Sequence, residues 1–127
     1  MMHRSRLGGL IIDCRTEDLE AAAEFWSQAL GCRMVRSIDP ADANYVQLET
    51  APNEPHLEVQ KVGHESRVHI DIETDDIEAE AARLEKLGAK RLEKIRTWLV
   101  MEAPTGQRFC LVKPQRAMFE TEGNIWD

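Results

Sequence analysis

Apolar residues recur at helical spacing in two segments of the chain, and each segment follows a short run of β-forming residues. The β-forming runs span residues 10–15 and 67–73. Spacings of three and four residues place the apolar side chains on one side of a helix. The two stripes are Leu19, Ala22, Ala23, Trp26 and Leu30, and then Ile77, Ala81, Leu84 and Leu87.

Cap residues mark the ends of both predicted helices. Thr16 and Thr74 precede pairs of carboxylates, so we expect each threonine to be an N-cap at an end where negative charge is favourable. Gly31 and Gly88 follow the last apolar positions, where glycine commonly ends a helix.

Three further strands are expected after each helix, because extended apolar runs alternate with turns rich in proline, glycine and aspartate. Each half of the chain therefore reads as βαβββ, and the fold class is α+β. The predicted strands span residues 32–37, 44–49 and 56–62, and then 90–94, 97–102 and 107–113.

The two halves also repeat in sequence. Residues 11–23 align without a gap on residues 69–81, and seven of the thirteen pairs are identical. The copies realign at Leu30-Gly31 and Leu87-Gly88 after one residue drops out. A repeat near half the chain length indicates two similar modules that bury apolar faces together.

Composition and charge argue against several classes of function. A chain of 127 residues is most simply one domain, and its net charge of −7 argues against nucleic-acid or anionic-membrane partners. No apolar run reaches the ~20 residues that a membrane-spanning helix needs. The cysteines are odd in number and lack a Cys-x-x-Cys spacing, which favours reduced thiols and a cytoplasmic location; they are Cys14, Cys32 and Cys110.

Four motifs occur in an order and spacing typical of one superfamily. They are Phe25-Trp26 followed by Leu30-Gly31, the strand Val68–Ile72, Leu87-Gly88-Ala89, and the turn and strand Ala103–Leu111. In these motifs the chain resembles the vicinal oxygen chelate superfamily, which includes glyoxalase I, bleomycin-resistance proteins and extradiol dioxygenases. Its glyoxalase-like branch is the most similar.

The resemblance implies two tandem βαβββ modules that form a curled mixed sheet, an open half-barrel around a cleft, with the helices outside. The glyoxalase-like domain would span residues 7–114, with modules at about 7–62 and 67–114. Residues 115–127 form a tail whose apolar residues favour packing on the body or on a partner. Members commonly dimerise, so we expect a homodimer.

In metal-dependent relatives, one side chain from the first and one from the last strand of each module reaches the metal. By position these are Ile11, Glu58 (or Gln60 if the strand shifts by two), His69 and Cys110. His69 and Glu58 fit as metal ligands, whereas Ile11 cannot bind metal and Cys110 stands where a carboxylate is usual. The resemblance thus implies one divalent ion (Ni, Zn, Fe or Mn) with an incomplete ligand set.

Strand alternation separates two faces of the sheet. Ile12, Cys14, Ile70 and Ile72 suit the face covered by helices, and the opposite face then carries Asp13, His69 and Asp71. His69 is a metal ligand, a general base or a histidine hydrogen-bonded within the sheet. Asp13 and Asp71 are acid–base groups or substrate anchors, or else each pairs with Arg15 or Arg67.

The other candidate residues have fewer possible functional roles. Cys110 is a ligand contact or a small buried apolar residue, and Trp98 is a candidate for stacking on a ligand. Trp26 belongs to the helix stripe and is expected to pack. The remaining histidines have no partner at ligand spacing and are expected on the surface; they are His3, His56 and His64.

These observations lead to one main hypothesis and two alternatives. The main hypothesis is a glyoxalase-like protein that binds a small oxygenated organic molecule, as a metal-assisted lyase, isomerase or dioxygenase. In that case His69 and Glu58 hold the ion, Asp71 or Asp13 moves protons, and Ile11, Gln60, Trp98 and Cys110 line the cleft. The alternatives are a metal-free binder of the bleomycin-resistance type and a regulatory dimer with a vestigial cleft.

Overall fold

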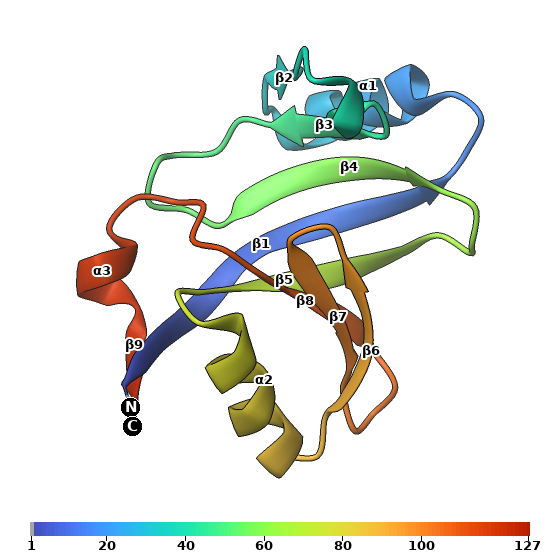
Figure 1. The fold of residues 1–127 in the computed structure, drawn as a ribbon. Coiled ribbons are helices and arrows are strands. Elements are labelled where there is room, and N and C mark those ends of the chain that lie inside the picture. Colours follow the sequence, from blue (N-terminus) through green and yellow to red (C-terminus); the bar gives the residue numbers. More distant parts are fainter. Residues whose placement is uncertain (1) are drawn as a thin grey trace. The chain divides into compact units, whose positions relative to one another are not determined.

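The computed structural model describes residues 2–127 and has the expected α+β composition (Figure 1). Contacts within the chain divide it into two compact units, which are described one at a time. One comprises Leu10–Val68 and is called the 10–68 unit. The other comprises the residues up to Gly9 together with His69–Asp127 and is called the 69–127 unit.

The 10–68 unit packs one helix on a sheet in which β2, β3 and β4 are antiparallel to their neighbours in that series. Its strand order is β2-β3-β4-β1, and the helix α1 packs most of the predicted apolar stripe on the sheet, whereas Leu30 at its end is exposed. Ala23, Val46, Leu48 and Val59 form the buried centre, with Trp26 packed against it. The elements are β1 (His3–Arg15), α1 (Leu19–Leu30), β2 (Met34–Val35), the 3-10 helix η1 (Pro40–Asp42), β3 (Tyr45–Leu48) and β4 (His56–Val62).

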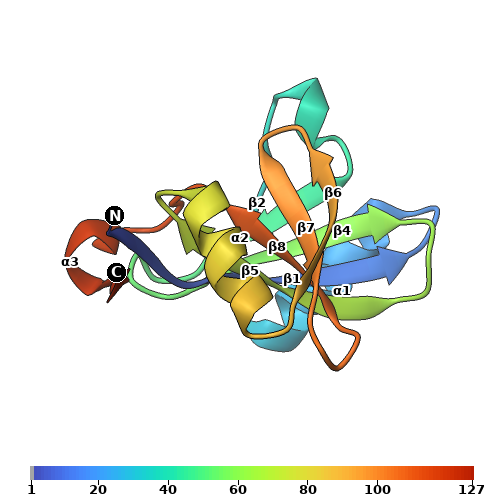
Figure 2. The same cartoon turned by 60° about the horizontal axis from the view of Figure 1, so that its bottom comes forward.

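The 69–127 unit repeats this plan with the helix α2. Its strand order is β5-β8-β7-β6, in which β5 and β8 run parallel and the other neighbours antiparallel. Ala81 and Leu84 of α2 pack on Leu99, Met101 and Leu111, and Figure 2 shows α2 lying over these strands. The elements are β5 (Arg67–Thr74), α2 (Ile77–Lys86), β6 (Lys90–Ile95), β7 (Trp98–Glu102), β8 (Arg108–Val112), α3 (Phe119–Glu122) and β9 (Asn124–Trp126).

The helix N-caps are aspartates rather than the predicted threonines. The carboxylate of Asp18 accepts a hydrogen bond from the Ala21 amide at 3.0 Å, and Asp76 does the same for Ala79 at 3.0 Å. Thr16 instead accepts the Asp18 amide at 2.9 Å and closes a turn before the helix. Each threonine therefore prepares the approach to the helix, and the acidic residue two positions later caps it.

The helix C-termini are as predicted. Gly31 has a φ of 70° and Gly88 a φ of 106°. This left-handed conformation is one that a residue with a Cβ rarely adopts.

Two strand lengths differ from the sequence-based prediction. The strand expected over residues 32–37 shrinks to β2, where only Met34 and Val35 pair with β3. The next residues turn into solvent, and Ile38 is fully exposed. In contrast, β1 begins at His3 rather than near residue 10, because its first residues pair with β9.

The C-terminal segment packs on the start of β1, as Figure 1 shows for α3 and β9. β9 runs antiparallel to β1 with His3 opposite Trp126, and Phe119 of α3 is buried. His3 is itself buried, and its Nε2 lies 2.8 Å from Oε1 of Glu80. The expectation that His3 lies on the surface is therefore wrong, whereas His64 is exposed and His56 half-buried.

None of the helices in residues 2–127 has both the length and the apolar character that crossing a membrane requires.

Candidate functional site

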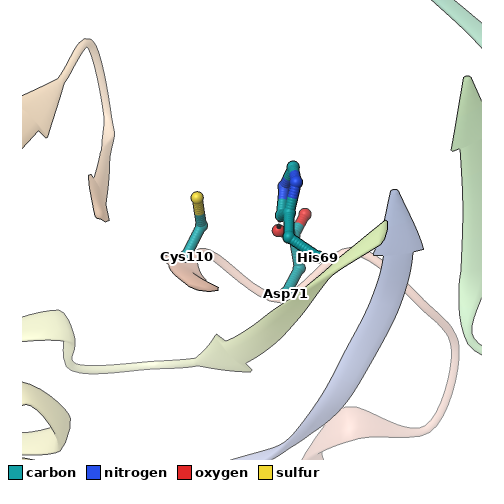
Figure 3. Close-up of side chains that lie close together, drawn as sticks. All are labelled: His69, Asp71 and Cys110. Carbon is teal, nitrogen blue, oxygen red and sulfur yellow. Dashed lines mark ion pairs between the residues drawn. The ribbon is translucent and has the colours of Figure 1, made fainter. Parts of the chain in front are cut away.

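The parallel strands β5 and β8 bring three candidate side chains together. Asp71 pairs directly with Cys110, and His69 lies two residues before Asp71 on the same strand. Residues at this spacing share one face of a sheet. Figure 3 shows the imidazole, the carboxylate and the thiol projecting to the same side of the strand pair. The next residues along the two strands, Ile72 and Leu111, pack in the core with α2, whereas Ile70, between His69 and Asp71, is exposed rather than covered by the helix as the sequence predicts.

The three side chains are close enough to share one ligand. One donor atom from each of His69, Asp71 and Cys110 lies within 4.8 Å of the other two. Nε2 of His69 lies 3.5 Å from Oδ1 of Asp71, and these side chains are 14% and 13% exposed. The side chains of His69 and Asp71 are thus largely buried, but a ligand can still reach them.

The carboxylate of Asp71 is incompletely satisfied. Its Oδ1 is buried and accepts no hydrogen bond from the described residues, because the contact with His69 is too long for a good one. A buried carboxylate oxygen in this state is costly unless a cation or a donor faces it. The arrangement therefore favours binding of a positively charged or hydrogen-bonding group beside Asp71.

The donor set fits a divalent transition metal. Imidazole nitrogen, carboxylate oxygen and thiolate sulfur are all ligands of zinc-type ions, and catalytic sites commonly use three protein ligands with a position left for water or substrate. The cluster of His69, Asp71 and Cys110 supplies one of each donor. A metal implied by the superfamily resemblance thus has a partial ligand group in the 69–127 unit.

Trp98 lies on the same sheet face as this cluster. Its strand β7 pairs with β8 so that Val100 is opposite Cys110, which places Trp98 one alternation further along that face. Trp98 is half-buried, and the Arg96 guanidinium lies 5.6 Å from its ring centroid. Ligand stacking by Trp98 stays a prediction.

In the 10–68 unit, Glu58 and Gln60 lie opposite the apolar side of β4. Val59 between them is buried against α1, so both polar side chains project from the other face. Gln60 donates a hydrogen bond from Nε2 to the Tyr45 hydroxyl at 3.0 Å. Glu58 is half-buried and pairs in register with Gln47. Metal binding by Glu58 and ligand contact by Gln60 stay predictions.

Asp13 and Ile11 occupy the matching face of β1. The Asp13 side chain is 2% exposed, and its Oδ2 lies 3.7 Å from Nε of Arg67. Of the two arginines considered from sequence, Arg67 is thus the one placed beside Asp13. Ile11 is buried, with 3% of its surface exposed. The position equivalent to His69 in the first copy of the repeat is therefore fully apolar.

The cysteines differ in their surroundings. Burial raises the pKa of the Cys14 thiol, which packs against the core under α1. Cys110 lies instead on the polar face, between the core-facing Phe109 and Leu111. All three cysteines are free thiols.

Sequence reasoning identified His69, Asp71 and Cys110 one at a time but missed their combination. The spacing of His69 and Asp71 reveals a shared strand face, whereas the pairing of Asp71 with Cys110 depends on the register of a parallel ladder. The strongest available signal was the position of both residues midway along strands of the same module.

Comparisons with known proteins identify the family. Residues 9–112 match the family model described as a glyoxalase-like domain. A search of curated proteins gives no match.

Among solved structures, a methylmalonyl-CoA epimerase from Mycobacterium tuberculosis has a TM-score of 0.64 at 16% identity, covering 86% of this chain and 87% of that one. A methylmalonyl-CoA epimerase in complex with methylmalonyl-CoA and ammonium has a TM-score of 0.61 at 19% identity, covering 91% and 97%. A Streptomyces coelicolor methylmalonyl-CoA epimerase variant in complex with 2-nitronate-propionyl-CoA has a TM-score of 0.59 at 19% identity, covering 91% and 97%.

At these identities the similarity to solved structures concerns the fold, which agrees with the family match over most of the chain. The chain therefore belongs to the glyoxalase-like domain family of the vicinal oxygen chelate superfamily.

Proposed function

We propose that this protein is an isomerase-type enzyme that moves a proton at a carbon next to a carbonyl group of a small oxygenated organic molecule. The observation that supports this most is the cluster of His69, Asp71 and Cys110, whose donor atoms lie within 4.8 Å of one another. Such a cluster can hold a divalent ion beside a reacting carbonyl. The family membership supports the same class of chemistry.

A bound divalent ion would act as a Lewis acid, which makes the neighbouring C–H group more acidic by stabilising negative charge on the carbonyl oxygen. His69 would hold this ion through an imidazole nitrogen. Two buried carboxylates, Asp13 and Asp71, are the candidates for accepting the proton, and Asp71 is available for this role only where it does not hold the ion. The carboxylate of Asp13 is held in place by Arg67, whose Nε lies 3.7 Å from Oδ2.

The ligands bound in the similar structures suggest the first substrates to test. Methylmalonyl-CoA and 2-nitronate-propionyl-CoA are bound in two of those epimerases. We therefore propose a starting panel of methylmalonyl-CoA, simpler 2-substituted thioesters and thiol adducts of 2-oxoaldehydes. The homodimer and the cytoplasmic location expected from sequence stay predictions.

The first test is the metal content of protein purified without a chelator or a histidine tag, measured by elemental mass spectrometry. We expect near-stoichiometric divalent metal in the wild type and loss of that metal in His69→Ala, with circular dichroism showing that the fold is intact. Unchanged metal content in His69→Ala, or a wild type that stays metal-free after incubation with nickel, zinc, iron and manganese, would contradict the proposed metal role.

The second test follows the proton itself. In deuterated water, NMR should show enzyme-dependent exchange of the substrate C–H, and Asp13→Asn should slow this exchange by about 10²- to 10⁴-fold while leaving metal content unchanged. A variant that loses metal and exchange together has instead lost a ligand. Exchange that persists in both Asp13→Asn and Asp71→Asn would rule out both carboxylates as the base.

A metal-free binding protein is the second candidate, and buried Ile11 is the observation that favours it. An apolar residue at that position suits an apolar part of a bound compound better than an ion. Equilibrium binding of a compound that is recovered unchanged after prolonged incubation would support this alternative. Turnover of the same compound would contradict it.

A further inference from the structure

We infer that Cys110 binds the metal as a thiolate in a ligand set contained within the β5–β8 strand pair, and that the site consequently takes Zn²⁺ or Co²⁺ in preference to Mg²⁺ or Mn²⁺. This inference rests on the proposed metal role and concerns which residues and which ion are involved. The ligand set expected from the sequence is incomplete, and the inferred set adds Asp71, a residue on the same strand as His69.

The geometry of the strand pair supports such a set. Asp71 and Cys110 are direct register partners in a parallel ladder, and His69 precedes Asp71 by one full alternation. A tetrahedral zinc site with bonds of about 2.0–2.3 Å separates its ligand atoms by roughly 3.3–3.8 Å. The three donor atoms already lie within 4.8 Å. The remaining gap is of a size that side-chain rotation can cover.

The polar environment supports a cation at this point. Oδ1 of Asp71 is buried and accepts no hydrogen bond from residues 2–127, and the imidazole Nε2 of His69 faces it at 3.5 Å. An ion between these atoms would satisfy the carboxylate directly. One carboxylate and one thiolate together carry two negative charges, so they balance a divalent ion and reduce the cost of placing it in a half-buried site.

The position of Cys110 also distinguishes it from a packing residue. Its strand neighbours Phe109 and Leu111 pack toward α2, whereas Cys110 projects from the opposite face beside Asp71. Cys14 shows the alternative arrangement, with its thiol against the core of the 10–68 unit and its pKa raised by burial. Unlike Cys14, Cys110 is therefore placed for ligation.

The thiolate decides the choice of ion. Carboxylate and water ligands suit hard ions such as Mg²⁺ and Mn²⁺, while thiolate and imidazole together favour zinc-type ions. A set containing sulfur, nitrogen and oxygen should thus bind Co²⁺ and Zn²⁺ tightly and resist competition from hard ions. Co²⁺ also gives a direct spectroscopic signal when sulfur binds to it.

The test is a titration of chelator-stripped protein with Co²⁺, followed by absorption spectroscopy. We expect one equivalent to produce an intense sulfur-to-cobalt charge-transfer band that Zn²⁺ abolishes and a large excess of Mg²⁺ or Mn²⁺ does not. Cys110→Ser should remove the band and weaken Co²⁺ binding by at least about tenfold, since even outer-shell changes cost about 10–100-fold. Cys32→Ser is the matched control and should keep both the band and the affinity.

Further variants separate this inference from the proposed function. Asp71→Asn should weaken binding while leaving the charge-transfer band in place at saturating Co²⁺. Tight binding without the band, and unaffected by Cys110→Ser, would overturn the inference while leaving the proposed metal role intact. Weakening by Glu58→Gln comparable to that by Asp71→Asn would overturn the ligand set within one strand pair. A wild type that binds neither Co²⁺ nor Zn²⁺ would overturn the inference and the proposed metal role together.

Discussion

At the scale of single residues, two glutamates are buried in the 69–127 unit, and each lies beside basic side chains. Glu80 is fully buried, with the His3 imidazole at 2.8 Å and two Arg83 nitrogens at 2.8 and 2.9 Å. Glu73, also fully buried, lies between Arg6 at 3.4 Å and Arg116 at 3.5 Å. Buried carboxylates with such partners are costly to disrupt, because removal of one partner leaves the other uncompensated.

Glu80 should make stability depend on pH. Burial acts to raise its pKa, but hydrogen bonds from Arg83, Ser5 and His3 outweigh burial, and the pKa falls below its ordinary value of 4.5. A lowered pKa in the folded state gives a stabilising contribution that is present above about pH 4.5 and lost as the pH falls through the folded-state value. Urea unfolding of the wild type should therefore show decreasing stability below this pH.

The matched variant for this prediction is Glu80→Gln, which keeps the size of the side chain and cannot ionise. We expect it to be less stable than the wild type at neutral pH, by about 3–5 kcal/mol at most. The difference between the two proteins should shrink as the pH falls below 4.5. A difference that stays constant down to acid pH would show that ionised Glu80 contributes nothing.

At the scale of elements, the two helices follow from sequence because their apolar spacing and terminal glycines agree. Ala23 and Trp26 of α1, like Ala81 and Leu84 of α2, face their sheets as the stripes require. The N-caps could not be fixed in the same way, because Thr16 and Asp18 are both good capping residues two positions apart. Which one caps depends on backbone angles that the pattern of residues does not determine.

The observed N-cap leads to a prediction for α1. Asp18→Ala removes the carboxylate that accepts the Ala21 amide and should lower the free energy of unfolding by about 1 kcal/mol. Thr16→Ala removes only the turn contact to the Asp18 amide and should cost less. Chemical denaturation of both variants measures the difference, and a larger loss in Thr16→Ala would restore threonine as the principal cap.

Only those features of the candidate site that follow from the alternation of side chains along one strand could be predicted. His69 and Asp71 lie two residues apart, so their common face follows from the sequence alone. Their proximity to Cys110 needs the register of β5 against β8, which no local pattern encodes. The same limit applies to β9, whose three residues are too few to show alternation and pair with the distant start of β1.

At the scale of the whole molecule, the C-terminal segment is part of the 69–127 unit and contacts the N-terminal residues that belong to the same unit. Phe119 is buried, with the Arg6 guanidinium 5.6 Å from its ring centroid, and the Trp126 ring lies beneath Arg83 at 3.8 Å. The Trp126 indole also donates a hydrogen bond to Ser5 at 2.8 Å. These contacts connect the last residues to β1 and α2.

Removal of residues 118–127 should therefore destabilise the protein. Loss of buried Phe119 alone should cost about 3–5 kcal/mol, and the unpairing of β1 from β9 adds to this. Thermal unfolding and limited proteolysis of the truncated chain measure the effect. Ile125→Ala is the matched control, because that side chain is exposed and should tolerate the change. Wild-type stability after truncation would mean that the segment only lies on the surface.

Buried Ile11 and half-buried His69 occupy equivalent positions in the two copies of the repeat, and this difference has an evolutionary consequence. After an ancestral duplication, each copy could accept substitutions that the other had no need to share. Polar side chains could then be kept in one copy, while the apolar side chains of the other copy could change in size. Change at position 11 leaves the donor atoms of the other copy unaltered, so the first copy could vary in a lineage without loss of the imidazole.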